Sequence, residues 1–73
     1  MTIKDLWLAT TYVGRVQLED ETHLISNPLL VAEGGLTTIV FDSKGNYTEY
    51  ANREVNYFDF MFNTMRIILK ENK

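Results

Sequence analysis

The segment 47–70 constrains the fold of this chain more than any other, because it carries most of the material for a hydrophobic core. It holds six of the nine aromatic residues and two of the three methionines, and it ends in a run of aliphatic residues. A chain of 73 residues has little else from which to build a core. We therefore expect the fold to be organised around this segment.

Two interpretations of residues 55–70 compete. Val55, Phe58 and Phe62 are spaced by three and four residues, which places them on one face of a helix. The same segment also alternates with a period of two, which is typical of two strands joined by a turn at 63–64. The many Tyr, Phe, Val and Ile residues favour strands. Two strands are the preferred prediction, and one long helix stays the alternative.

Local signals predict a short helix and then a strand at the start of the chain. Thr2 is a good N-cap, and the carboxylate of Asp5 suits the positive end of a helix dipole, so residues 2–8 are predicted to be helical. Alternating apolar and polar residues indicate a half-exposed strand at 12–19. Gly14 within that strand predicts a bend, a bulge or a close backbone approach.

The middle of the chain is expected to be extended. Pro28 predicts that the strand over 22–32 is bent, and the alternative is a single helical turn capped by Asn27. The β-branched residues of 36–41 predict another strand. The segment 42–46, Asp-Ser-Lys-Gly-Asn, has the pattern of a type I turn with a bulge that joins two antiparallel strands.

These elements combine into a mainly β domain with a short N-terminal helix. The predicted strands, all antiparallel, are 12–19, 22–32, 36–41, 47–62 and 65–70. Since the second and the fourth are long and bent, the expected architecture is a five-stranded, strongly bent antiparallel sheet or half-open barrel. The whole chain, 1–73, is predicted to form a single domain.

Composition argues against several classes of protein. The chain has no cysteine and one histidine, so neither a disulfide nor a structural zinc site is expected. The net charge of −3 disfavours broad contact with a phosphate backbone. No apolar run could span a bilayer and the first residues do not resemble a signal peptide, so a cytoplasmic location is expected. Self-association is also expected, because small domains without such cross-links often need it.

No residue pattern indicates an enzyme, a cofactor or a metal. His23 is the only histidine, and Ser26 and Ser43 lack the flanking glycines of a nucleophile elbow. The acidic residues 19–21 are more typical of a solvated turn than of a cation site. The aromatic residues at 57–62 are interpreted as core or as a subunit interface, because Asn and Asp, rather than Lys and Arg, are interleaved with them.

The order of one helix and five strands, with a long second and fourth strand, resembles the Sm/LSm fold, including the small Sm-like proteins encoded by phages. Met65-Arg66-Ile67-Ile68 is similar to the Val-Arg-aromatic-Ile sequence of the last strand in that family. Asn63-Thr64 stands where the family turn has Arg-Gly, and Ala32-Glu33-Gly34-Gly35 stands in the loop that carries the family's Asp-x-x-Met-Asn motif.

The resemblance implies a homo-oligomeric ring in which the fourth strand of one subunit pairs with the fifth strand of the next. It also implies single-stranded RNA binding at the pore, through the loops 33–36 and 63–66. In this chain the Asn63 amide would bind a base edge and the Arg66 guanidinium would bind a phosphate. The glycines at 34–35 would allow a nucleotide to lie close to the backbone. The implied RNA-binding residues are Gly34, Gly35, Asn63, Thr64 and Arg66.

Two functions from different classes are therefore expected. The first is an oligomeric, ring-forming Sm-like protein that binds single-stranded RNA or other nucleic acid in processing or regulation. The alternative, which the small size and acidic charge favour, is a small phage protein that binds and inhibits a host protein. Clustering of Arg15, Lys44, Arg53 and Arg66 would favour the first function, and scattering of these groups would favour the second.

Overall fold

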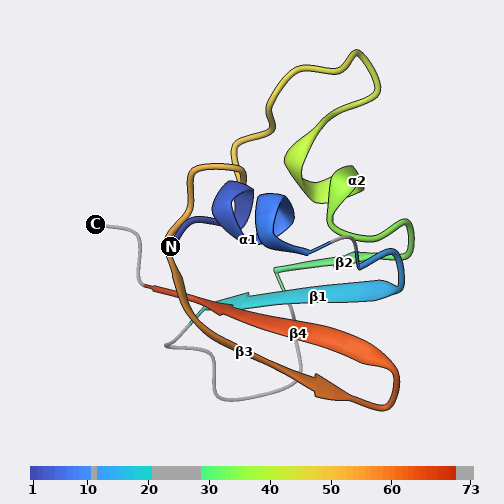
Figure 1. Ribbon diagram of the computed structural model, residues 1–73, viewed down its shortest axis with the longest axis vertical. Coiled ribbons are helices and arrows are strands. Elements are labelled where there is room, and N and C mark those ends of the chain that lie inside the picture. The colour runs from blue at the N-terminus through green and yellow to red at the C-terminus, as the bar shows by residue number, and fades with distance from the viewer. Residues whose placement is uncertain (11, 21–28, 71–73) are drawn as a thin grey trace.

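The computed structural model describes residues 1–10, 12–20 and 29–70. Their helices and strands are α1 (Ile3–Ala9), β1 (Arg15–Asp20), β2 (Leu30–Ala32), α2 (Thr37–Val40), β3 (Val55–Met61) and β4 (Thr64–Leu69). The four strands form one open sheet in the order β2-β1-β4-β3. Both helices lie on the same side of this sheet, and the hairpin end of β3 and β4 extends away from them (Figure 1).

The sheet is mixed. β1 pairs antiparallel with β2 and β3 pairs antiparallel with β4, but β1 and β4 are parallel neighbours. A mainly β domain with a short N-terminal helix is confirmed, whereas the predicted all-antiparallel sheet is wrong, and the described residues contain four strands rather than five. The long connection over 33–54 carries the chain from β2 across the helix side of the sheet to β3 (Figure 1). The β3–β4 hairpin then places β4 beside β1, in the same direction as β1.

The predicted N-terminal helix is confirmed with its cap. The Thr2 Oγ1 atom accepts a hydrogen bond from the Asp5 N–H at 3.1 Å, and Asp5 Oδ2 accepts one from the Thr2 N–H at 3.0 Å. This capping box satisfies two backbone donors that the first helical turn leaves without partners. The same hydrogen bonds lower the pKa of Asp5. Ile3 and Leu6 are buried, which fixes the helix against the sheet.

The preference for two strands over 55–70 is also confirmed. β3 and β4 pair from Val55↔Leu69 to Met61↔Thr64. The turn between them consists of Phe62 and Asn63, one residue earlier than predicted, and both have positive φ values, 51° and 60°. Two successive residues in the left-handed region define a type I′ turn, whose twist matches that of a two-residue β-hairpin.

Two strand predictions in the middle of the chain are wrong. Residues 37–40 form the helical turn α2, in which Ile39 and Val40 are buried, because packing against the sheet outweighs their β propensity. The strand predicted at 47–62 begins only at Val55. Residues 47–54 fold into turns instead, and the carbonyls of Ala51 and Arg53 accept hydrogen bonds from the start of α1 rather than from a neighbouring strand.

The turn at 42–46 and the bend at Gly14 are confirmed. Gly45 has a φ of 82° and its N–H donates to the Asp42 carbonyl at 3.1 Å. The turn is flanked by a single antiparallel bridge, Phe41↔Tyr47, rather than by two strands. The bend predicted around Asn27 and Pro28 lies outside the described residues.

The core lies between the sheet and the two helices. Val16 and Leu18 of β1 and Met65, Ile67 and Leu69 of β4 point into it. The rest of the core cluster comes from the helices, the connection and β3, namely Ile3, Leu6, Leu36, Ile39, Val40, Ala51 and Val55.

The aromatic residues at 57–62 are not part of this core. Tyr57, Phe58, Phe60 and Phe62 are all exposed, so their interpretation as core residues is wrong, and the alternative of a subunit interface stays a prediction. The segment 47–70 does organise the core, but through its aliphatic residues. No helix among the described residues has the length and apolar character needed to cross a membrane.

Candidate functional site

The outer strand of the sheet, β3, carries an unusual display of large apolar side chains. Those of Tyr57, Phe58, Phe60, Met61 and Phe62 are each more than two fifths exposed. We call these five residues the aromatic edge. Contiguous exposed apolar surface of this kind on a small protein commonly marks a place where another molecule binds.

The aromatic edge has two sides, because alternate residues of a strand face opposite ways. Phe58 is paired with Ile67, and Phe60 with Met65, so both phenylalanines lie on the helix side of the sheet. There the centroid of the Phe60 ring lies 5.4 Å from that of the Tyr12 ring and 6.5 Å from that of the Phe58 ring, and both contacts are edge-on. The apolar surface continues from Tyr12 into a shallow groove of about 390 Å³ beside α1.

Phe62 stands at the tip of the hairpin and is 92% exposed. Its φ of 51° lies in the left-handed region, where a side chain with a Cβ is disfavoured and glycine or asparagine is usual. Placing a phenylalanine there costs about 1 kcal/mol of stability. The side chain gains no burial in return, which is the pattern expected of a residue kept for contact with another molecule.

A pocket of about 250 Å³ lies beside this tip, on the sheet face opposite the helices. It combines two guanidinium groups, an amide, a hydroxyl and an exposed aromatic ring. Its lining residues are Arg15, Gln17, Met61, Phe62, Thr64 and Arg66. We call it the hairpin pocket.

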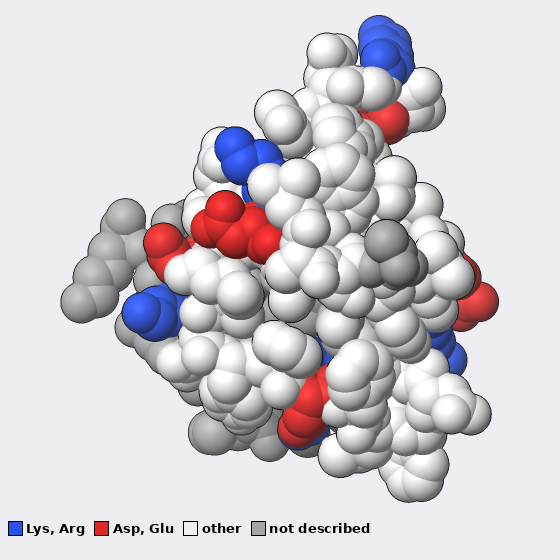
Figure 2. All heavy atoms as spheres, viewed as in Figure 1, with Lys and Arg blue, Asp and Glu red and all other residues white. Residues whose placement is uncertain are grey.

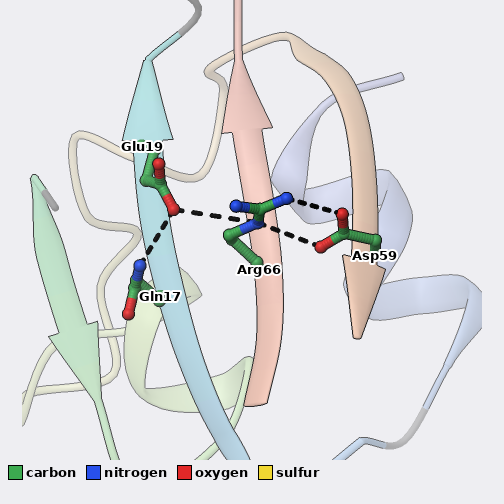
Figure 3. A network of polar contacts seen from close by, with 4 residues as sticks. All are labelled: Gln17, Glu19, Asp59 and Arg66. Carbon is green, nitrogen blue, oxygen red and sulfur yellow. Dashed lines mark hydrogen bonds and ion pairs between the residues drawn. The ribbon is translucent and has the colours of Figure 1, made fainter. Parts of the chain in front are cut away.

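A charged network runs across the same open face of the sheet (Figure 3). Arg66 of β4 donates from Nε and Nη2 to the two carboxylate oxygens of Asp59 on β3, at 3.1 and 2.7 Å. Arg66 Nε also lies 3.8 Å from Glu19 Oε2 on β1, and that oxygen accepts a hydrogen bond from Gln17 Nε2 at 2.9 Å. The network links three neighbouring strands, and two carboxylates neutralise Arg66.

The hydrogen bonds from Arg66 lower the pKa of Asp59, and the same contact raises the pKa of Arg66. A carboxyl whose pKa is lower in the folded state stabilises the fold above its ordinary pKa of 3.8, and that stabilisation is lost as the pH falls through the folded value. Asp59→Asn should therefore cost about 1 kcal/mol at neutral pH, a small value because the Asp59 side chain is 41% exposed and solvent screens the pair.

The measurement is urea unfolding of the wild type and Asp59→Asn between pH 2 and pH 7. The difference in unfolding free energy should shrink as the pH falls below about 4. Arg66→Met provides the control, because adding Asp59→Asn to it should produce no further change with pH. A difference that stays constant across the pH range would contradict a stabilising ion pair.

The predicted glycines lie away from the hairpin pocket. A Cβ built on Gly34 would lie 2.5 Å from the Thr38 side chain. Gly35 has a φ of 86°, and a Cβ on it would lie 2.7 Å from the Cα of Val13. The close approach at Gly35 is thus made by the chain's own backbone.

The other three predicted residues lie at or next to the pocket. Thr64 and Arg66 line it, while the backbone carbonyl of Asn63 lies 3.1 Å from the Tyr12 hydroxyl. That hydroxyl is also 3.1 Å from the carbonyl of Arg15, so Tyr12 ties the hairpin tip to the start of β1. The structure therefore brings together three of the five predicted residues and places the two glycines elsewhere.

The basic residues do not gather in one place. Arg15 and Arg66 share the hairpin pocket, but Arg53 Nη2 donates to the Lys70 carbonyl and Lys44 belongs to the turn at 42–46. Figure 2 shows the basic groups of one face at separate positions, with acidic groups between them. No broad positive patch appears among the described residues on that face.

Sequence reasoning missed Phe62, Gln17 and Met61 as pocket residues. A usable signal existed for Phe62, because pairing the two strands through a two-residue turn places it at a left-handed position. His23 and Ser26 lie outside the described residues.

The described part of the chain contains no group of three or more His, Cys, Asp or Glu side chains arranged to hold a metal ion. No protein family, curated protein or solved structure matches this chain significantly.

Proposed function

We propose that this protein is a non-enzymatic binding protein that takes an extended polypeptide along strand β3. The observation that carries the proposal is the aromatic edge, in which an outer strand exposes aromatic side chains on both of its sides. An unpaired strand edge offers backbone donors and acceptors to another chain, and apolar side chains on alternate positions then select what binds.

The strain at Phe62 supports this function. A left-handed phenylalanine that is almost fully exposed weakens the fold, and strained residues of this kind cluster at binding and catalytic sites. Tyr, Phe and Met are also the side chains enriched in the centres of protein interfaces.

The charge distribution favours a protein as the bound molecule. Asp59 is the only charged residue on β3, and Arg66 neutralises it. The chain carries a net charge of −3, which opposes the accumulation of phosphates. Inhibition of a host protein by a small phage protein, the alternative predicted from the sequence, is one biological form that this function could take.

Single-stranded RNA binding is the second candidate, and the hairpin pocket is the observation that favours it. Arg15 and Arg66 lie there beside the exposed ring of Phe62, which could stack on a base. The Sm-like relationship, the ring and the cytoplasmic location stay predictions from the sequence. Several pockets brought together in one assembly would be needed to offset the acidic charge.

Phe62→Gly separates a binding role from a structural one. Removing the strain should raise the free energy of unfolding by about 1 kcal/mol. Loss of the exposed ring should weaken binding of an extended peptide about tenfold. The peptide is obtained by selecting a random displayed library on the immobilised wild type, and its affinity is measured by fluorescence anisotropy. Asn63→Gly is the matched control, since it places glycine in the same turn and keeps the ring.

The proposal fails if the library yields no peptide above background, or if the selected peptide binds Phe62→Gly as tightly as the wild type. Oligonucleotides of uridine and of adenosine are tested in the same assay at low salt. Binding that weakens with salt and with Arg15→Ala, in the absence of peptide binding, would establish the RNA candidate instead.

A further inference from the structure

The free part of the β3 edge can be defined residue by residue. Met61 and Thr64 flank a two-residue turn, so they form a hydrogen-bonded pair, and such pairs alternate along the antiparallel ladder. Tyr57 and Asp59 therefore direct their N–H and C=O groups toward β4. Phe58 and Phe60 direct theirs away from the sheet, and these outward groups have no hydrogen-bond partner among residues 1–10, 12–20 and 29–70.

The start of the strand is already covered. The Val55 N–H donates to the Met1 carbonyl at 2.7 Å, and Thr2 forms a bridge with Glu54. The free edge is therefore short and centred on Asp59, with one outward-facing phenylalanine on each side of it.

We propose that a second copy of this chain pairs with β3 antiparallel, about a two-fold axis near Asp59. Phe58 of each copy then faces Phe60 of the other, which satisfies every outward N–H and C=O group of both residues. A two-fold interface of this type uses the same patch on both copies and closes at two subunits. The inference rests on the proposed function, in which β3 accepts an extended polypeptide. Here the extended polypeptide is strand β3 of a second copy of the chain.

The side chains complement their own copies. Pairing brings two phenylalanines from each copy together on the helix side, beside Tyr12, where edge-on aromatic contacts already exist. The two Asp59 carboxylates face one another on the other side, and the bidentate Arg66 of each copy offsets their repulsion. β3 also lacks the lysines and prolines that commonly protect an exposed strand from pairing.

A ring built from unlike edges is a poorer fit to the described residues. The other edge of the sheet, β2, has three residues, Leu30–Ala32, and offers a short template for β3. Two copies of β3 match one another in length, and the two-fold arrangement uses both. Pairing β3 with its own copy therefore joins two edges of equal length and uses both outward-facing phenylalanines of each copy.

The interface is expected to be weak. Covering the half-exposed side chains of the aromatic edge in both copies removes roughly 800 Å² of surface, compared with the ~1,200 Å² of a small stable interface. The dissociation constant should thus be on the order of tens of micromolar. The dimer should form at high protein concentration and dissociate on dilution.

The test combines sedimentation equilibrium with amide hydrogen exchange from about 10 µM to 1 mM, a range chosen to span the expected dissociation constant. A monomer–dimer equilibrium is expected, with exchange of the Phe58 and Phe60 amides slowing about tenfold at the high end. The Tyr57 and Asp59 amides, which face β4, should exchange slowly throughout. A dimer in which the Phe58 and Phe60 amides stay unprotected would overturn the pairing, and so would a larger defined oligomer.

Phe60→Pro and Phe60→Ala form a matched pair of variants. Both lose the ring, but only proline also removes the outward N–H, and an edge strand tolerates proline at such a position. Phe60→Pro should dimerise at least tenfold more weakly than Phe60→Ala. Equal dimerisation by the two variants would overturn backbone pairing through β3.

The library peptide separates failure of this inference from failure of the proposed function. If the protein stays monomeric at 1 mM but binds the selected peptide, and the Phe58 and Phe60 amides are protected in that complex, then β3 binds other polypeptides but not a second copy. The proposed function then stands and the dimer is overturned. A monomer that binds no peptide overturns both proposals.

Discussion

Leu18→Ala should lower the free energy of unfolding by about 3 kcal/mol, within the range of 2–5 kcal/mol seen for buried leucines. Leu18 lies in the centre of β1, is 0% exposed and packs between the sheet and the helices. Truncation removes its transfer free energy and leaves a cavity lined by side chains that β4 and α1 hold in place. A domain of this size has a total stability of about 4–10 kcal/mol, so the loss is a large fraction of it.

Leu8→Ala makes the same chemical change at a position that is 70% exposed on α1. It should change the stability by no more than about 0.5 kcal/mol, because little surface is buried there and alanine favours a helix. Urea unfolding followed by circular dichroism measures both variants. Similar losses for the two would mean that β1 does not lie at the centre of the core.

Gly35→Ala should be nearly as damaging, with an expected loss of about 3 kcal/mol. Two costs add at this position. The φ of 86° is disfavoured for any residue with a Cβ, and the new methyl group would lie 2.7 Å from the Cα of Val13 and 2.9 Å from the carbonyl oxygen of Tyr12. Both atoms belong to the backbone, so the methyl group can be accommodated only if the two segments move apart.

Gly45→Ala isolates the first of these costs. Gly45 has a similar φ, 82°, but a Cβ there would have no neighbour within 4 Å. We expect a loss of about 1 kcal/mol for this control. The difference between the two variants, measured by urea unfolding, gives the contribution of the close backbone contact. Equal losses would indicate that Gly35 is needed for its conformation alone.

Local signals in the sequence predicted several elements correctly. Thr2 and Asp5 marked the helix start because their hydrogen bonds are made within one turn of the chain. The hairpin at 55–69 was predictable because its alternation, its β-forming side chains and its short turn all indicate the same structure. The turn at 42–46 depends on one aspartate and one glycine, and it formed even without the flanking strands.

What could not be predicted depends on contacts between distant segments. Ile39 and Val40 are intrinsically strand-forming, yet they lie in α2 because that helical turn buries them against the sheet. The parallel contact of β1 with β4 could not be read from β1, because helices cover only one face of the sheet. β1 therefore alternates between buried and more exposed residues, which is typical of an antiparallel strand, instead of forming the continuous apolar run of a parallel strand covered on both faces.

In the candidate site, too, local features were predictable from the sequence, and features that depend on distant segments were not. Alternation in β3 predicts two faces but does not say which of them the helices cover, and α1 and α2 cover neither at the hairpin end (Figure 1). The sequence therefore leaves open whether Phe58 and Phe60 belong to the core or to a subunit interface. Arg66 was identified as a binding residue, but its bidentate contact with Asp59 depends on a strand register that the turn sets.

The parallel contact between β1 and β4 also sets the order in which the sheet can assemble. Paired residues such as Arg15 and Thr64 are about 50 positions apart, so a long loop must close before this contact forms. The β3–β4 hairpin needs only local closure and should form within microseconds. We expect the hairpin to be the template on which β1 docks, and the rate of folding to be limited by that encounter.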